Sequence, residues 1–408
     1  MSYSPTAPRA ELDMTLFWSV ALLLSIGLVM VYSSSITMAE ADKYSDHSMH
    51  YYLRRQALFV LLGLVAGFIT FQIPIALWQR LALPLFMIGG FLLVIVIIPG
   101  VSPKINGAHR WIRLGFMNFQ PSELMKFIVV LYAADYTVRK AAFMNDFKKG
   151  FLPMLSVMFF MGAMLQFEPD YGALVVTTTI AMAILFLGGM NWRIFMGLLI
   201  LLATTLTALV VYTPYRLKRV DGFINPWKDE FDTSYQLTHS LMAIGRGEWF
   251  GVGLGGSVEK LFYLTEAHTD FIFAIIAEEL GFVGVAAVIS LFVLLVFRAF
   301  AVGREAMMRE KYFASLVAQG IGVWLGIQAI INMGVNMGAL PTKGLTLPFI
   351  SYGGTGILVN CVAIAVLLRI DAENRAGKRP PSAARAASAS PPVASPAVTS
   401  AAPSGAIA

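Results

Sequence analysis

Long apolar stretches recur along the chain and are separated by short polar segments. A membrane hydrocarbon core about 30 Å thick needs roughly 20 apolar residues in a helix, because each residue adds about 1.5 Å. We predict transmembrane helices at 14–34, 56–76, 81–99, 121–137, 151–167, 171–190, 194–213, 271–297, 312–337 and 351–369. The pattern therefore predicts an all-α, polytopic membrane protein with ten transmembrane helices and a large extracytoplasmic loop between helices 7 and 8.

The composition agrees with this pattern. The 408 residues are 57% hydrophobic and only 13% charged, and the mean hydropathy is +0.71. So much apolar surface exceeds what a water-soluble core can hide. We divide the chain into a cytoplasmic N-terminus at 1–13, a membrane domain at 14–370 that includes the extracytoplasmic loop 214–270, and a disordered cytoplasmic tail at 371–408, rich in Pro, Ala and Ser.

Lysines and arginines in the short loops predict the orientation. They gather at 139–149, 298–311 and 369–379, which places both termini in the cytoplasm. The outer side still carries several cations, among them Arg110 and Lys343. They suit a phosphate-bearing lipid, but pairing with the outer carboxylates explains them equally well. The single cysteine excludes an intrachain disulfide, and the five histidines show no zinc-ligand spacing. We expect contact with membrane lipids and no nucleic-acid partner.

Two outer segments are rich in glycine. GRGEWFGVGLGGS, in the long loop, lacks the GK[ST] ending of a phosphate-binding loop, so we interpret it as a tight surface turn. PTKGLTLPFISYGGTG, at 341–356, has the prolines and glycines typical of a re-entrant or cavity-lining segment. Such a backbone is tolerated at membrane depth only where protein or water satisfies its amides. Lys343, within it, is placed to meet a phosphate or a carboxylate.

Acidic residues mark the start of the eighth predicted helix. Asp270 stands where the long loop enters it, and its position suits either a helix cap or a general base beside a lipid headgroup. Glu278 and Glu279 lie about 12 and 13 Å further along at about 1.5 Å per residue. An unpaired carboxylate at that depth costs several kcal/mol. We predict that Lys126, near the outer end of the fourth helix, forms a buried ion pair with one of these two glutamates.

Four motifs, in order, resemble the SEDS family (shape, elongation, division and sporulation) of bacterial cell-wall polymerases. They are RWIRLGFMNFQPSELMK, EPDYG, GVGLGGSVEKLFYLTEAHTDFIFAIIAEELG and PTKGLTLPFISYGG. The resemblance covers nearly everything from the first to the tenth predicted helix. PTKGL and the long tail look more like the division member of the family than the elongation member. One departure is Asn118, where many relatives have an arginine, so the role of that arginine cannot be transferred.

The resemblance implies a peptidoglycan glycosyltransferase that polymerises lipid II, an undecaprenyl-pyrophosphate disaccharide-pentapeptide, with inversion, at the outer face of the cytoplasmic membrane. The essential aspartate of the family carries over to Asp270 as catalytic base. We assign Arg110, Lys343, Glu266 and His268 to substrate binding. We assign Glu123, Lys126, Glu278 and Glu279 to structure or the lining of a cavity. No cofactor is certain, and a divalent cation (Mg or Mn) is left open as a stabiliser of the pyrophosphate.

The resemblance also implies partners and a place in the cell. The expected partners are the class B penicillin-binding protein FtsI, which crosslinks the new glycan, and the divisome proteins FtsQ, FtsL and FtsB, at the division septum. Three alternatives stay open at this point: a lipid II flippase, a RodA-like elongation polymerase, and a scaffold without enzymatic activity.

Overall fold

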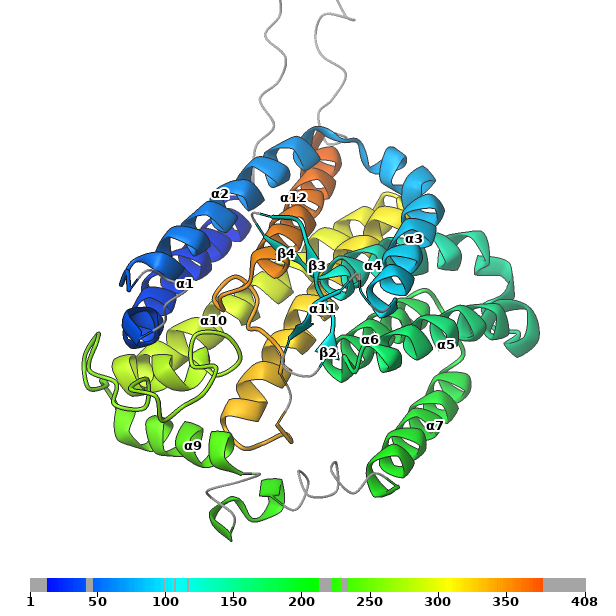
Figure 1. Cartoon of the computed structure of the whole chain (residues 1–408). Coiled ribbons are helices and arrows are strands. Elements are labelled where there is room, and N and C mark those ends of the chain that lie inside the picture. Colours follow the sequence, from blue (N-terminus) through cyan, green and yellow to red (C-terminus); the bar gives the residue numbers. More distant parts are fainter. Residues whose placement is uncertain are drawn as a thin grey trace, which may run out of the picture.

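The chain folds into a bundle of long helices (Figure 1). The structure is a computed structural model, and it describes residues 13–41, 47–98, 100, 102–105, 108–115, 117–212, 222–228, 234–342 and 344–376. The long helices are α1 (Met14–Ala41), α2 (Tyr51–Gln72), α3 (Ile75–Ile97), α4 (Pro121–Arg139), α5 (Leu152–Phe167), α6 (Tyr171–Leu187), α7 (Trp192–Val211), α10 (Ile272–Met308), α11 (Tyr312–Asn336) and α12 (Gly354–Ala376).

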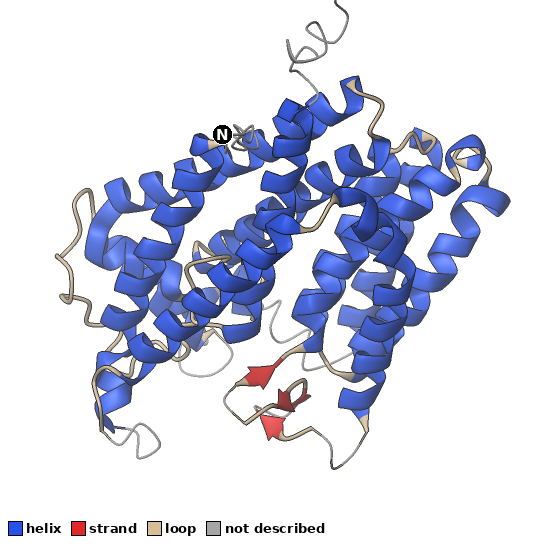
Figure 2. Ribbon diagram, turned by 90° about the horizontal axis from the view of Figure 1, so that it is seen from above, coloured by secondary structure: helices blue, strands red, loops and turns tan. Residues whose placement is uncertain are grey.

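The shorter elements belong to the connections. Between α3 and α4 the chain forms two small antiparallel ribbons, which lie together beside the helices in Figure 2. Strand β1 (Lys104–Ile105) pairs with β2 (Ala108–His109), and β3 (Ile112–Arg113) pairs with β4 (Asn118–Phe119). The turns η2 (Ala141–Phe143) and η3 (Phe147–Phe151) precede α5, and the long loop before α10 contains η4 (Pro226–Lys228) and α9 (Tyr235–Gly247).

Each predicted transmembrane segment overlaps one of the long helices. Within the described residues, seven helical stretches are long and apolar enough to cross a membrane: α1, α2, α3, η3 with α5, α10, α11 and α12. Helices α6 and α7 are apolar but shorter, and α4 carries charged residues along its length. The chain is therefore a multi-pass helical membrane protein, whereas ten crossings remain a prediction.

The helices at the centre of the bundle are more deeply buried than the helices that surround them. Helices α4 and α11 are buried along nearly their whole length, and α4 packs against α3, α6 and α11. Helix α12 packs against α2, and α10 packs against α1, α11 and α9. The surrounding helices expose large apolar side chains, such as Phe68, Phe91 and Phe159. In a membrane this apolar surface faces lipid tails, which stabilises it without a protein partner.

Helix α10 differs from the predicted segment 271–297 in two ways. It continues to Met308, and it is broken at Gly281, whose φ of 65° and ψ of −164° are not helical. The residues before the break, Ile272 to Glu279, are all buried, whereas Phe282 and Val283 just after it are exposed. The first part of α10 therefore belongs to the protein interior beneath the long loop, and the second part forms the apolar span.

The C-terminal helix also differs from its prediction. Helix α12 begins at Gly354 rather than at 351 and continues to Ala376, past the expected start of the tail at 371. The last turns are held by polar contacts: Arg375 pairs with Asp371 at 2.7 Å and lies 3.9 Å from Asp13. The rest of the predicted tail, 377–408, and residues 1–12 of the predicted N-terminus lie outside the described residues.

Candidate functional site

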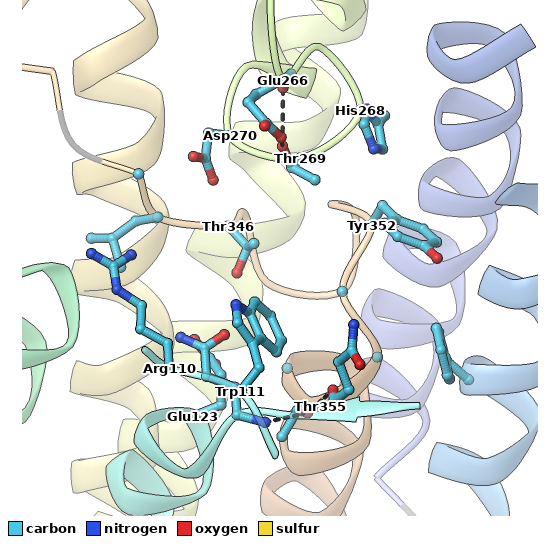
Figure 3. A pocket seen from close by; sticks show the side chains of 18 of the residues that line it. Arg110, Trp111, Glu123, Glu266, His268, Thr269, Asp270, Thr346, Tyr352 and Thr355 are labelled. Carbon is cyan, nitrogen blue, oxygen red and sulfur yellow. Dashed lines mark hydrogen bonds between the residues drawn. The ribbon is translucent and has the colours of Figure 1, made fainter. Parts of the chain in front are cut away.

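A cavity of about 380 Å³ lies where three non-helical segments meet. These segments are the ribbons before α4, the end of the long loop before α10, and the segment that enters α12. Figure 3 shows side chains from all three turned toward the same space. The lining residues include Arg55, Arg110, Trp111, Glu123, Asp170, Glu266, His268, Thr269, Asp270, Thr346, Tyr352 and Thr355. Five residues predicted from sequence are thus brought together: Arg110, Glu123, Glu266, His268 and Asp270.

Asp270 does not cap the helix that follows it. The N-cap residue of α10 is Phe271, and no side chain caps that helix. In the part of the chain that the structure describes, no group donates a hydrogen bond to the Asp270 carboxylate (Figure 3). Burial raises its pKa to about 7, the negative charge of Glu266 adds to this rise, and the positive charge of Arg110 opposes it. A carboxyl group with this pKa changes protonation near neutral pH, as a general base requires.

The backbone of Asp270 is held by amide side chains on α11. Asn332 Nδ2 donates to the carbonyl oxygens of Asp270 (2.9 Å) and Leu345 (2.6 Å), and Asn336 Nδ2 donates to the Asp270 carbonyl at 3.0 Å. One turn earlier, Gln328 Nε2 donates to the carbonyl of Thr346 at 2.9 Å. The spacing of four residues places these amides on one face of the helix. That face fixes the two cavity-lining segments relative to each other.

The two segments are also bonded directly. The Ser351 hydroxyl donates to the Thr269 carbonyl at 2.6 Å, and the amide of Tyr352 donates to the His268 carbonyl at 2.9 Å. A Cβ on Gly344 would lie 2.8 Å from Asp270 Oδ2, so any other residue there would require the carboxylate to shift. As predicted for 341–356, this non-helical segment is deeply placed: Phe349 and Ile350 lie against Gly27 of α1.

Arg110 holds the turn between α5 and α6. Its Nε donates to the carbonyl of Glu168 at 3.0 Å, and its Nη2 donates to that of Pro169. Asp170 accepts hydrogen bonds from the Ser122 hydroxyl (2.8 Å) and the Ala173 amide (3.1 Å). The Glu168 carboxyl is fully buried, and its pKa is raised to about 8 by burial and by the charge of Asp170. Arg110 thus supplies positive charge at the cavity while also fixing its wall.

The opposite end of the cavity is aromatic. His268 packs against Tyr52 and Tyr352, with ring centroids 4.9 and 5.5 Å away. Burial lowers the pKa of His268, and the nearby Glu266 charge opposes that shift. Glu266 itself accepts a hydrogen bond from the Thr269 hydroxyl at 2.7 Å. A neutral imidazole among aromatic rings offers hydrogen bonding and an apolar face together, which suits a sugar better than a phosphate.

The predicted ion pair between Lys126 and Glu278 or Glu279 is wrong. Lys126 is fully buried, pairs with Glu123 at 2.7 Å, and donates to Gln328 Oε1 at 2.9 Å. Its contact with Gln328 shows that it points from α4 toward α11, and Glu123 lies one turn away on the same face of α4. Glu123 and Lys126 therefore support the cavity wall as a pair, and Gln328 connects them to the Thr346 carbonyl.

The two glutamates of α10 find their partners in the long loop instead. Glu278 accepts from the Ser257 hydroxyl (2.5 Å) and the Val258 amide (3.0 Å), and lies 3.4 Å from Arg246. Glu279 pairs with Lys260 at 2.8 Å and accepts from the Ser33 hydroxyl of α1 at 2.7 Å. The prediction that these carboxylates must be neutralised was sound, but they anchor the long loop and do not line the cavity.

The chain matches the family model described as cell cycle protein (FtsW, RodA and SpoVE) over residues 14–376. It belongs to this family. It is 57% identical over 375 residues to the probable peptidoglycan glycosyltransferase FtsW of Aromatoleum aromaticum, with 92% of each chain covered. It is 55% identical over 384 residues to the protein of the same name from Nitrosomonas europaea, covering 93% of this chain and 99% of the relative. The resemblance to the SEDS family, and to its division member FtsW, is confirmed.

Solved structures support the same assignment. The chain superposes on a chain of a peptidoglycan synthase complex, studied for its coordination of polymerization and crosslinking, with a TM-score of 0.72 and 27% identity, covering 89% of this chain and 98% of that one. It also superposes on the rod shape determining protein RodA of Thermus thermophilus, with a TM-score of 0.64 and 26% identity, covering 90% and 98%. The fold of the membrane domain is therefore that of the SEDS proteins.

Some predicted features of the site are not tested by the structure. Lys343 lies outside the described residues. Among the residues that are described, no group of three or more His, Cys, Asp or Glu side chains could hold a metal ion. Other members of the site were not selected from sequence, among them Asp170, Thr346 and Tyr352. Asp170 belongs to the family motif EPDYG, and Thr346 and Tyr352 belong to the segment 341–356, which was predicted to be re-entrant or cavity-lining without any of these side chains being singled out.

Proposed function

We propose that this chain is a peptidoglycan glycosyltransferase that polymerises lipid II into glycan strands at the outer face of the cytoplasmic membrane during septal cell-wall synthesis. The names of its relatives support the reaction class. The observation that carries the site assignment is the Asp270 carboxylate, which lines the cavity with a pKa raised to about 7. The proposal gives it the role of catalytic base.

The proposed reaction is a single displacement. Asp270, ionised, takes the proton from a hydroxyl group of the acceptor sugar. That hydroxyl oxygen forms a bond to the anomeric carbon of the donor as the bond from this carbon to the lipid pyrophosphate oxygen breaks, so the configuration inverts. A positioned base contributes about 10²–10⁴-fold to such a reaction. The pyrophosphate leaves with its negative charge, which the positive charges of Arg110 and Arg55 on the cavity wall would stabilise.

Further roles follow from the positions of the other residues. His268 and Tyr352, at the aromatic end, would contact a sugar ring, and Glu266 would orient the acceptor beside Asp270. Lys343 is proposed as an additional cation for the pyrophosphate. A divalent cation (Mg or Mn) is retained as a possible stabiliser of the same charge, and no step of the proposed reaction is assigned to it.

The proposed cellular setting extends the family membership. We infer ten membrane crossings, both termini in the cytoplasm, and a location at the division septum. The partner would be the class B penicillin-binding protein FtsI, with FtsQ, FtsL and FtsB in the same assembly. Supporting this, a chain of a peptidoglycan synthase complex shares the fold over most of its length.

The test is polymerisation of purified lipid II by this chain together with its cognate penicillin-binding protein, comparing wild type with Asp270→Asn at matched complex formation. Glycan strands from the wild type alone would support the polymerase and the base. Equal polymer from both would remove Asp270 from the chemistry. No polymer from either, with transbilayer movement of lipid II in vesicles, would favour the flippase; no activity of either kind would favour a scaffold.

A further inference from the structure

The glycine-rich turn at residues 248–255 forms backbone hydrogen bonds with the residues on both sides of the break in α10. The amides of Val252 and Gly253 donate to the carbonyls of Glu278 (2.9 Å) and Glu279 (3.1 Å), which the break leaves without helical partners. In the other direction, Phe282 and Val283 donate their amides to the carbonyls of Glu248 (2.9 Å) and Trp249 (3.1 Å). The turn therefore satisfies both ends of the break and is fixed to it.

Two glycines allow this close approach. Gly251 in the turn has a φ of 76° and Gly281 at the break has a φ of 65°, and a Cβ on either would collide with backbone atoms of the opposing segment. Only glycine adopts these conformations readily and leaves that space. The turn thus cannot move away from α10 without breaking four hydrogen bonds, and its side chains are held in a defined direction.

Those side chains are large, apolar and exposed. The exposed fraction is 82% for Phe250, 65% for Trp249, 62% for Leu254 and 56% for Phe282 at the break. The rings of Trp249 and Phe282 are in contact, with centroids 5.3 Å apart. This surface continues along α10 into the exposed side chains of Val283, Val293 and Phe297. The apolar surface of the turn is therefore continuous with the lipid-facing surface of the span.

Helix α1 gives the height of the turn in the bilayer. Asp13 precedes its first residue and is paired with Arg298, which marks one polar edge of the bundle. Ser33 lies 20 residues further along, which corresponds to about 30 Å, the thickness of a hydrocarbon core. Ser33 bonds Glu279, two residues before the break. The turn thus lies at the outer boundary of the hydrocarbon, where tryptophan and other aromatic side chains are enriched.

We propose that Trp249, Phe250 and Leu254 insert into the outer leaflet of the membrane and anchor the long loop at the height of the lipid headgroups. The occupant is the lipid bilayer itself, because the patch continues the lipid-facing surface of α10 and stands at the boundary depth. The anchor holds the loop that carries Asp270 at a constant distance from the surface on which lipid-linked substrates lie. This inference does not depend on the proposed reaction.

Fluorescence quenching in lipid nanodiscs tests the insertion. The full chain, without a partner, carries a fluorophore on Phe250→Cys or, as a matched control in the middle of the span, on Ser290→Cys, an exposed position nine residues after the break and eight before Arg298. Both are made in a Cys361→Ala background, which removes the single, buried native cysteine. The nanodiscs contain phosphatidylethanolamine and phosphatidylglycerol with a nitroxide quencher placed either near the headgroup or near the end of the acyl chain.

The two sites are expected to give opposite orders of quenching. Position 250 should be quenched more strongly by the shallow nitroxide and weakly by aqueous iodide, and position 290 more strongly by the deep nitroxide. Strong iodide quenching at 250, with no quenching by either lipid, would overturn the proposal. Shielding of that site from iodide only after addition of the penicillin-binding protein would overturn it too, because the turn would then be a protein-docking surface.

Discussion

Asp270 lies close in sequence to Glu278 and Glu279, yet the surroundings of its carboxylate differ from theirs. The two glutamates accept hydrogen bonds from hydroxyl and amide groups and are paired with Arg246 and Lys260. Among the described residues, the hydrogen bonds to Asp270 from side chains reach its backbone carbonyl, and its carboxylate is directed into a cavity (Figure 3). Neighbouring acidic residues in one motif therefore occupy different environments.

The difference shows how a buried carboxylate can serve either stability or chemistry. Partners that satisfy every oxygen make a carboxylate part of the structure, because its removal leaves their charges and donors unpaired. A carboxylate without partners is costly to ionise, and the raised pKa of Asp270 expresses that cost. In the proposed reaction, the same cost favours transfer of a proton from the acceptor sugar to this carboxylate. Variants of each group should therefore affect activity and stability separately.

The largest effect is expected on activity from Asp270→Asn. Polymerisation of lipid II should fall by about 10²–10⁴-fold because the proton acceptor is lost. The thermal midpoint of the purified protein in detergent should not fall, since the side chain makes no hydrogen bond or ion pair among the described residues and the amide carries no charge to desolvate. Loss of both activity and stability in this variant would place Asp270 with the structural carboxylates and contradict the distinction between it and the two glutamates.

The largest effect on stability is expected from Lys260→Met. It leaves Glu279 buried with the Ser33 hydroxyl but without its cation, and breaking a buried pair costs about 3–5 kcal/mol. Thermal unfolding in detergent measures the change. The double variant Lys260→Met with Glu279→Leu should recover much of the loss. Arg246→Met is the matched control, with a smaller effect because Arg246 is half exposed and 3.4 Å from Glu278.

A methyl group beside Asp270 should reduce activity without unfolding the protein. The Cβ of Gly344→Ala would lie 2.8 Å from Asp270 Oδ2 and displace the carboxylate. Since misplacement by about 1 Å can cost up to about 10²-fold, we expect roughly a tenfold fall in kcat. Gly353→Ala, in the same segment, is the control, because its Cβ meets only Thr346 at 3.9 Å. Equal kcat values for the two variants would contradict the proposed position of the base.

The smallest expected effects are shifts in the pH dependence of kcat/KM. Asp270 acts as a base only when ionised, so kcat/KM for polymerisation should fall as pH decreases below its pKa of about 7. Glu266→Gln removes a negative charge that raises this pKa and should move the fall to lower pH. Arg110→Gln removes a positive charge that lowers it and should move the fall to higher pH. Identical pH profiles in all three proteins would show that another group limits the rate.

Much of the fold follows from local patterns. Each predicted apolar stretch overlaps a long helix, because the spacing and length of apolar residues depend only on nearby sequence. The break at Gly281 was not predicted. A single glycine in an apolar run is compatible with a continuous helix, and the break depends on the turn at 248–255 supplying hydrogen-bond partners from elsewhere in the chain.

The sequence by itself determined the membrane class, the family, and the motifs that supply Arg110, Glu123, His268 and Asp270, because these are properties of composition and of residues near one another in the chain. Only the tertiary structure decided which charges meet. Lys126 pairs within α4 and not with α10, and Lys260 reaches Glu279 because the long loop folds back over that helix. Ion pairs depend on distances of a few ångströms between segments remote in sequence, which periodicity does not encode.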